Sequence, residues 1–328
     1  MTAGCTQVAA RGASSGAPPP PLREIEAASR PPVPVASGLT CAVVIPTLGR
    51  DHLLARLLVQ LGRQRRRPDA VVVSAVGSEG IDETARYPFP VTYIYGSKGS
   101  CVQRNRALRA TVDLFDVVTF FDDDFIPADT YLENLLAAMA RHRDWVVVTG
   151  HVVQDGIRGP GLLFDEGLAR LATRRPVSDT DPNVAPRTGA YGCNMSIRAE
   201  AARGHFFDER LVLYGWQEDI DFTHQLWQRG RVVQIDTLEG VHLGHKSGRV
   251  SGVRFGYSQM VNPLYLIRKG TMPPHFGLAL MARNLAGNLL KSIRPEAYID
   301  RRGRLKGNLL GLWHAATGRL EPEYILRL

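Results

Sequence analysis

Apolar and polar positions alternate regularly between residues 41 and 150. Apolar runs rich in β-branched residues are short enough for buried strands, and they stand at 41–46, 70–76, 91–95, 116–121 and 145–150. Leucines recur with helical spacing over 51–61, where we expect a helix with Asp51 as its N-cap. Two further helices are predicted at 101–111 and 130–142.

This order of elements predicts an α/β fold. Strands that alternate with helices favour right-handed βαβ units and a mainly parallel sheet flanked by helices. In such sheets, ligands bind beyond the carboxyl ends of the strands. Polar residues that directly follow an apolar run are therefore the first candidates for a functional site.

Three consecutive carboxylates, Asp122, Asp123 and Asp124, follow the apolar run 116–121. Adjacent carboxylates repel each other and are poorly solvated at the end of a buried strand, so a counter-charge is needed. Side chains two positions apart in an extended chain point to the same side, and hard oxygen ligands suit Mg²⁺ or Mn²⁺. A solvated acidic loop tip is the simpler alternative, but the position at a strand end favours a metal or phosphate site.

The phosphate-binding loops of common nucleotide-binding sheets are not found. PTLGR follows the first predicted strand, where GxGxxG would stand, and the sequence contains no GxxxxGKS. This disfavours a dinucleotide dehydrogenase and a P-loop NTPase. A nucleotide would have to be held by side chains and a metal.

A second acidic cluster lies in YGWQEDIDFTHQLWQRG, residues 214–230. Trp216, Ile220, Thr223 and Trp227 share one face of a predicted helix, and Gly230 ends it. Glu218 and Asp219 would lie in the first turn, where acids complement the helix dipole or, beside a cleft, act as a general base.

His242 and His245 follow the next predicted strand, 231–236. The pair could bind a metal, or each histidine could be an ordinary surface or core residue.

The composition indicates a globular chain with a basic end. The chain has 328 residues, 44% of them hydrophobic, and a net charge of +8. Residues 251–328 hold 12 Lys and Arg against 4 acids, which accounts for the whole excess. Cys5, Cys41, Cys101 and Cys193 show no disulfide or zinc spacing, which fits reduced thiols in the cytoplasm.

Three regions are therefore expected. Residues 1–38, rich in Pro, Ala and Ser and without the apolar run of a signal peptide, are predicted to be a disordered leader. Residues 39–250 form the α/β domain, and 251–328 form a basic helical extension. The apolar segment 275–293 in that extension is interrupted by Arg283 and Lys291, which disfavours a spanning helix. It either packs on the protein itself or lies on an anionic membrane surface.

The ordered set VVIPTLGR, CVQRNRAL, FFDDDFIP, GCNMSIR and WQEDIDFTHQLWQRG, followed by a histidine, resembles glycosyltransferase family 2. The resemblance covers roughly residues 41–250. It implies the GT-A fold and an inverting transfer from a nucleotide sugar that depends on Mn²⁺ or Mg²⁺.

The resemblance also implies roles for particular residues. Asp122 would lie near the ribose, Asp124 would ligate the metal together with His242 or His245, and Asp219, with Glu218 as the alternative, would be the catalytic base. Trp216 and Asn194 would lie near the sugars. The residues expected around the nucleotide are Pro46, Thr47, Arg50, Ser74, Arg104, Asn105, Asp122 and Asp123.

One departure concerns the donor base. Members of the family usually have an Asp-rich stretch after the second strand, whose first Asp contacts uracil, whereas this chain has SAVGSEG at 74–80. Either Ser74 or a backbone group contacts the base, or the donor is not a uridine nucleotide.

The function expected from these features is sugar transfer to a saccharide or lipid-linked acceptor in the synthesis of cell-surface polysaccharide or glycolipid. The enzyme would be cytoplasmic, or peripheral at the inner face of the plasma membrane. A sugar-phosphate nucleotidylyltransferase is one alternative, although PTLGR is short for its loop. A nucleic-acid-binding protein is the other, but the basic tail lacks a recognisable motif, and we expect no nucleic acid as partner.

Overall fold

The computed structural model describes residues 38–174, 182–246 and 251–328. The predicted leader lies outside the described residues except for Gly38. The predicted boundary between residues 250 and 251 lies at the edge of a stretch, 247–250, that is likewise not described. The division into three regions therefore stays a prediction.

A single nine-stranded sheet forms the centre of the described chain. Its order is β3-β2-β1-β4-β8-β6-β9-β5, and β7 pairs with β9. The strands are β1 (Cys41–Pro46), β2 (Ala70–Ala75), β3 (Val91–Tyr95), β4 (Val117–Phe121), β5 (Phe125–Pro127), β6 (Trp145–Asp155), β7 (Val184–Pro186), β8 (Asn194–Arg198) and β9 (Arg231–His242).

The first half of the sheet is parallel, as expected, and the second half is mixed. Strand β1 pairs in parallel with β2 and β4, and β2 pairs in parallel with β3. Strand β8 then runs antiparallel between β4 and β6. Because β4 is central, the residues after Phe121 emerge in the middle of the sheet edge, where ligands of α/β proteins bind.

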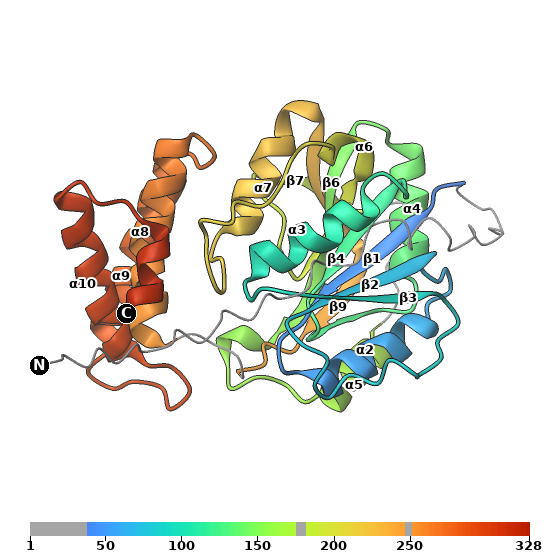
Figure 1. Cartoon of the computed structure of the whole chain (residues 1–328), viewed down its shortest axis with the longest axis horizontal. Helices are drawn as coiled ribbons and strands as arrows, with labels where there is room; N and C mark the ends of the chain where they lie inside the picture. The colour runs from blue at the N-terminus through green and yellow to red at the C-terminus, as the bar shows by residue number, and fades with distance from the viewer. Residues whose placement is uncertain (1–37, 175–181, 247–250) are drawn as a thin grey trace, which may run out of the picture. The chain divides into compact units, whose positions relative to one another are not determined.

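Helices cover both faces of the sheet (Figure 1). In the body they are α2 (Asp51–Gly62), α3 (Ser100–Thr111), α4 (Tyr131–Arg141), α5 (Phe164–Ala172), α6 (Ala199–Ala202) and α7 (Glu218–Leu226). After these come α8 (Gly252–Lys269), α9 (Pro274–Lys291) and α10 (Arg301–Ala316), and 3₁₀ turns occur at Gly156–Arg158, Trp227–Arg229 and Pro322–Arg327.

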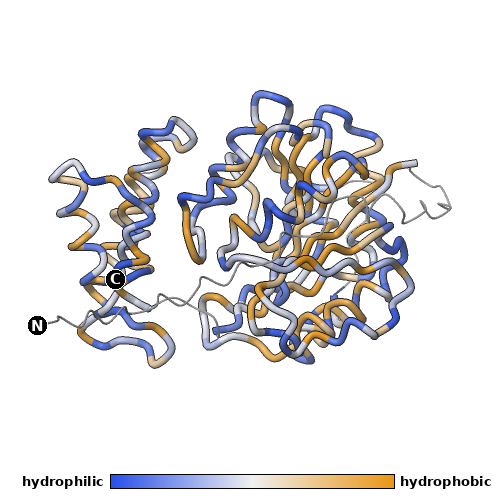
Figure 2. The backbone as a smooth tube through the Cα atoms, viewed as in Figure 1, coloured by the Kyte–Doolittle hydropathy of each residue, from blue (hydrophilic) through white to orange (hydrophobic). Residues whose placement is uncertain are grey.

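Alternation along β1 separates two apolar layers. Val43 and Ile45 pack with α2 and α4, whereas Val44 packs on the opposite side with α3 and α7. Figure 2 shows the hydrophobic residues concentrated along the strands between these helices. The strands that lead to the site, β4 among them, are thus packed on both faces.

Two predicted helix starts are wrong. Helix α2 begins at Asp51, so Arg50 takes the cap position, and no side chain caps the helix there. Helix α7 begins at Glu218, because Gln217 has a left-handed backbone with φ of 75°. Trp216 therefore precedes the helix, while Glu218 and Asp219 lie in its first turn, as predicted.

The C-terminal helices contact each other closely and are anchored to the body. A Cβ atom on Gly256 of α8 would lie 2.0 Å from the carbonyl oxygen of Arg304, so these two backbones are in contact. Leu266 and Met272 join the apolar layer under α3 and α7, and the Lys269 ammonium lies 2.8 Å from carboxylate oxygens of Asp208 and Asp221. None of the helices in the described ranges has the length and apolar character needed to cross a bilayer.

Candidate active site

The loop after β4 separates the three carboxylates. Asp122 and Asp124 line a cavity of about 420 Å³, whereas Asp123 is fully buried beneath it. The Phe125 N–H donates to the Asp122 carbonyl, which closes a tight turn. Because of this turn, Asp122 and Asp124 face the cavity, and Asp123 points into the protein interior.

Asp123 anchors the loop. Thr47 donates its hydroxyl to Asp123 at 2.7 Å, and the Arg50 guanidinium lies 2.7 Å from its other oxygen. Burial raises the pKa of Asp123 to about 7, and Arg50 opposes this shift. The Asp123 carboxylate is thus occupied by protein partners, and its expected position beside the nucleotide stays a prediction.

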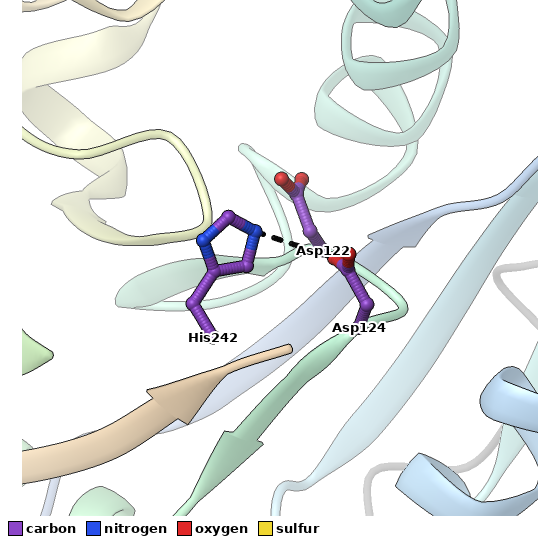
Figure 3. Close-up of side chains that lie close together, drawn as sticks. All are labelled: Asp122, Asp124 and His242. Atoms are coloured by element: carbon purple, nitrogen blue, oxygen red, sulfur yellow. Dashed lines mark ion pairs between the residues drawn. The ribbon is translucent and has the colours of Figure 1, made fainter. Parts of the chain in front are cut away.

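Asp122, Asp124 and His242 form a cluster of metal-binding type (Figure 3). One potential ligand atom from each lies within 4.8 Å of the others, and His242 Nε2 is 3.6 Å from Asp124 Oδ1. His242 is the last residue of β9, which brings a strand from far along the chain to the DDD turn. Two carboxylates with one imidazole suit a divalent ion such as Mn²⁺.

A second carboxylate orients His242. Asp155, at the end of β6, lies 2.8 Å from His242 Nδ1, and the Tyr191 hydroxyl donates to Asp155 at 3.1 Å. An Nδ1–H that donates to a carboxylate leaves Nε2 directed at the cluster, which is the usual support of a metal-ligating histidine. Burial disfavours the imidazolium, but Asp124 and Asp155 outweigh it and raise the pKa of His242 to about 10. Sequence reasoning missed Asp155 and Tyr191, which no nearby motif marks.

His245 takes a different position from His242. Its main-chain N–H donates to Asp124 Oδ2 at 2.8 Å, and its ring lies edge-on to His52, 5.9 Å away. The ring is not among the ligand atoms of the cluster in the described residues. Burial disfavours ionisation of Asp124, but His242, Arg50 and this N–H together hold its pKa well below the usual range.

Arg104 joins the two acidic motifs. Its guanidinium lies 2.8 Å from Asp122 and also pairs with Glu218, and the side chain is 3% exposed. Burial opposes the guanidinium charge, but the two carboxylates outweigh it and raise the pKa of Arg104. A single buried cation thus fixes the end of β4 against the start of α7.

Glu218 and Asp219 both line the cavity but differ in availability. Glu218 is bound to Arg104, and its burial and the neighbouring Asp219 raise its pKa to about 8. Asp219 is more exposed and receives N–H groups from Gly192 at 3.0 Å and Ile220 at 2.8 Å. Burial raises the pKa of Asp219, and the Gly192 N–H opposes that shift. The two N–H groups orient a carboxylate that still has free lone pairs.

The remaining predicted residues divide into two groups. Pro46, Thr47, Arg50, Arg104, Trp216 and His245 line the cavity as well.

Ser74, Asn105 and Asn194 are buried and are not among the residues that line the cavity, so their expected contacts with a nucleotide or sugar stay predictions. The Ser74 hydroxyl receives an N–H from Arg106. Asn105 binds the backbone of Phe207, and Asn194 accepts the Thr149 hydroxyl. Strand and helix periodicity identified the motifs but not which face each side chain takes.

Several cavity residues carry no motif. Tyr214 and Trp216 each lie 5.8 Å from Phe255, ring centre to ring centre, and these aromatic residues form one wall. Phe255, Ile299 and Arg304 come from the C-terminal helices and their connecting segment, so this region contributes to the cavity. Leu213 and Gln217 have positive φ angles of 60° and 75°, a strained backbone that is often found at functional sites.

Solved structures with a similar fold were found, at low sequence identity. Staphylococcus aureus TarS 1-349 in complex with UDP-GlcNAc is 14% identical, with 86% of this chain and 93% of that chain covered and a TM-score of 0.50. GalNAc-T7 with UDP, GalNAc and Mn²⁺ is 13% identical, with 88% of this chain and 57% of that chain covered and a TM-score of 0.48. Glucosyl-3-phosphoglycerate synthase from Mycobacterium tuberculosis, in complex with Mn²⁺, UDP and glucosyl-3-phosphoglycerate, is 18% identical. The match covers 79% of this chain and 88% of that chain, with a TM-score of 0.47.

These likenesses concern the fold alone. The match to another structure of S. aureus TarS covers 40% of that chain. No curated protein matches the chain by sequence.

A family model matches part of the chain. Residues 42–200 match the model described as glycosyl transferase family 2. The matched region runs from β1 past β8 and includes the DDD turn and Arg104, and the α/β fold with a central sheet agrees with it. Over residues 42–200 the chain thus matches glycosyltransferase family 2, and its fold is of the GT-A type.

Proposed function

We propose that this protein is an inverting, metal-dependent glycosyltransferase. It would move a sugar from a nucleoside-diphosphate sugar to a hydroxyl of a saccharide or lipid-linked acceptor. The observation that carries the proposal is the position of Asp122, Asp124 and His242 in the same cavity as Asp219. A charge-stabilising site and a base candidate in one cavity are the two elements that a direct displacement needs.

The ligand set fits a divalent cation. Asp122, Asp124 and His242 would hold it, with Asp155 behind the imidazole. A bound Mn²⁺ or Mg²⁺ would stabilise negative charge on the leaving nucleoside diphosphate. The imidazole favours Mn²⁺, because Mg²⁺ prefers a shell of oxygens.

The protein's own groups would perform the proton transfer. Asp219, held by the N–H groups of Gly192 and Ile220, would accept the proton of the acceptor hydroxyl as that oxygen attacks the anomeric carbon. Glu218 is the weaker base candidate, because Arg104 occupies it. The aromatic wall with Trp216 would exclude water and bind a sugar face.

The donor base has no assigned contact in this proposal. Ser74 is fully buried, and its carbonyl accepts N–H groups from Thr47 and Gln103. The neighbour of TM-score 0.50 binds UDP-GlcNAc, which makes a uridine nucleotide the first donor to test. Free, buried thiols at Cys41, Cys101 and Cys193 support a reducing compartment such as the cytoplasm.

A thermal-shift screen tests the proposal. The protein is heated with UDP, GDP, dTDP or CDP, each with Mn²⁺, with Mg²⁺ or with a chelator. A ligand at about 100 times its Kd that binds only the folded state adds about 2.7 kcal/mol, which shifts the midpoint clearly. We expect one nucleotide to stabilise the protein in a metal-dependent manner.

The Asp124→Asn variant should lose the metal-dependent part of that shift, and Asp113→Asn, a surface carboxylate, should keep it. No shift with any nucleotide in either metal would contradict the proposed donor and metal together.

A further inference from the structure

Helices α9 and α10 and the segment that joins them expose several large apolar side chains. We call this set the α9–α10 apolar surface. It comprises Leu278, Leu289, Leu290, Ile293, Leu309 and Trp313, which are 53%, 55%, 70%, 77%, 57% and 57% exposed. Single exposed leucines are normal on proteins, but a group on neighbouring elements marks an interaction surface.

The geometry of the two helices brings these residues together. On α9, Gly277, Leu280, Met281 and Asn288 are buried, and the exposed leucines take the other side of the helix. Asn288 donates to Asn308 at 2.8 Å, and Leu289 and Leu309 follow these two residues directly. Figure 2 shows orange and blue segments interleaved along these helices. The helices thus pack through one side and leave an apolar side uncovered in the described chain.

Basic residues surround this surface. Residues 274–316 contain seven Lys or Arg and two acids, Glu296 and Asp300. Both acids are engaged: Glu296 lies 2.7 Å from Lys291 and 2.8 Å from Arg301, and Asp300 caps α10 through the N–H of Gly303. Exposed Arg283, Arg294, Arg302 and Lys306 make no ion pair among the described residues. The surface is therefore both apolar and positively charged.

We propose that the α9–α10 apolar surface docks on a membrane that contains anionic lipids. Leucine, isoleucine and tryptophan side chains would enter the headgroup region, while the surrounding Arg and Lys contact lipid phosphates. A second copy of the chain fits less well, because it would bring the same basic residues face to face. The helices would lie on the membrane, since none in the described ranges is suited to span it.

The surface is connected to the catalytic cavity. Ile293 and Tyr298, both exposed, belong to the segment that joins α9 and α10. The same segment supplies Ile299 to the cavity wall, and Arg304 follows in the first turn of α10. Docking would therefore place the cavity beside the lipid headgroups. This step, which rests on the proposed function, assigns a lipid-linked saccharide as the acceptor class.

Vesicle flotation tests the docking surface. The purified full chain is mixed with vesicles of phosphatidylcholine alone or with added phosphatidylglycerol. We expect binding to the anionic vesicles that weakens with salt. The double variant Leu290→Glu with Ile293→Glu should bind at least about tenfold more weakly, because two buried apolar contacts are lost. Leu163→Glu, at a leucine 72% exposed on the body, is the matched control and should bind like the wild type.

Two further readouts separate the outcomes. Trp313 should give a blue-shifted fluorescence on anionic vesicles, and this change should disappear in Trp313→Phe. Removing both Arg302 and Lys306 should weaken binding about fivefold per charge. Equal binding by the double variant and the wild type would overturn the proposal. So would a concentration-dependent dimer of the wild type that the double variant abolishes without any vesicle binding, since the surface would then bind a second copy.

The docking result is independent of the proposed function. The double variant should keep the metal-dependent nucleotide shift, because neither position lines the cavity. Failure of flotation with an intact nucleotide shift would reject the membrane surface alone. Flotation without any nucleotide shift would reject the donor assignment and leave the surface standing.

Discussion

The charged side chains of the cavity and of the C-terminal helices differ in both sign and burial. Around the cavity, carboxylates are buried and held by a few buried cations, as in the contacts of Arg104 with Asp122 and Glu218. On α9 and α10, the charges are basic, exposed and loosely distributed between exposed leucines. Buried charge fixes a geometry, because every partner that is lost leaves an uncompensated ion. Exposed charge selects a partner and contributes little to the fold.

The strongest way to break the cavity side of this comparison is Asp124→Asn. This change removes a ligand of the proposed cation and the partner of His242 Nε2. We expect transferase activity to fall at least about 10³-fold, because stabilisation of the leaving group is lost. Activity with a nucleotide sugar, measured over a range of Mn²⁺ concentrations, checks this. Full activity of the variant at ordinary Mn²⁺ would remove Asp124 from the metal site.

Asp219→Asn should separate chemistry from binding. We expect kcat to fall about 10²- to 10⁴-fold, because the proposed general base is lost. The metal-dependent nucleotide shift should stay, since Asp219 is not in the cluster with Asp122, Asp124 and His242. Steady-state kinetics together with the thermal shift measure both effects. If Glu218→Gln reduces kcat more than Asp219→Asn without unfolding the protein, the roles of the two acids must be exchanged.

Arg104→Met tests the structural weight of the buried charge. The variant leaves Glu218 buried without its cation and takes one partner from Asp122. We expect the free energy of unfolding to decrease by about 3–5 kcal/mol, as in other broken buried ion pairs. Urea denaturation measures this change. The matched control is Arg56→Met, whose pair with Asp165 is exposed and should contribute about 0–1 kcal/mol. Equal losses in the two variants would contradict the comparison.

The pH dependence of activity on the acid side tests the role of Asp219 without a mutation. A base must be deprotonated, and burial raises the pKa of Asp219 above its ordinary value. Activity at saturating Mn²⁺ and donor should therefore rise about tenfold per pH unit up to a pKa above that of an ordinary aspartate and then level off. An acid limb that ends at the ordinary aspartate value would show that Asp219 is not the base that limits activity.

Sequence reasoning reached the elements and the acidic motifs but not all of their orientations. The apolar runs located β1, β2, β3 and β4, and the position after β4 identified Asp122 and Asp124, because strand ends gather in parallel sheets. The insertion of β8 between β4 and β6 could not be predicted, since strand order depends on long-range pairing. For the same reason Asp155 was missed, because it reaches His242 from 87 positions away along the chain.

Local sequence patterns also did not predict which way a side chain points when that direction depends on a single backbone position. Asn105 follows Arg104 in α3, so a helix turn of about 100° per residue directs it away from the cavity toward Phe207. Gln217 has a left-handed backbone, so α7 begins only at Glu218. No residue type in the sequence predicts this conformation. Motif spacing thus identifies a site, and the side-chain directions need the tertiary structure.

The smallest predicted effect concerns the C-terminal helices. Here close packing of the helix backbones, and not buried charge, is expected to determine stability. Gly307 lies where α10 meets α8, and a Cβ atom there would be 2.1 Å from the Val253 carbonyl oxygen and 2.6 Å from the Tyr257 nitrogen. Gly307→Ala should therefore decrease the free energy of unfolding by about 1–3 kcal/mol, despite the higher helix propensity of Ala. Gly287→Ala in α9 meets no atom within 4 Å and should increase it by about 0.5–1 kcal/mol. Thermal or urea unfolding of both variants measures the difference in sign. Stabilisation by both substitutions would mean that α8 and α10 do not pack at this distance, and the close helix packing on which the proposed docking surface rests would then be absent.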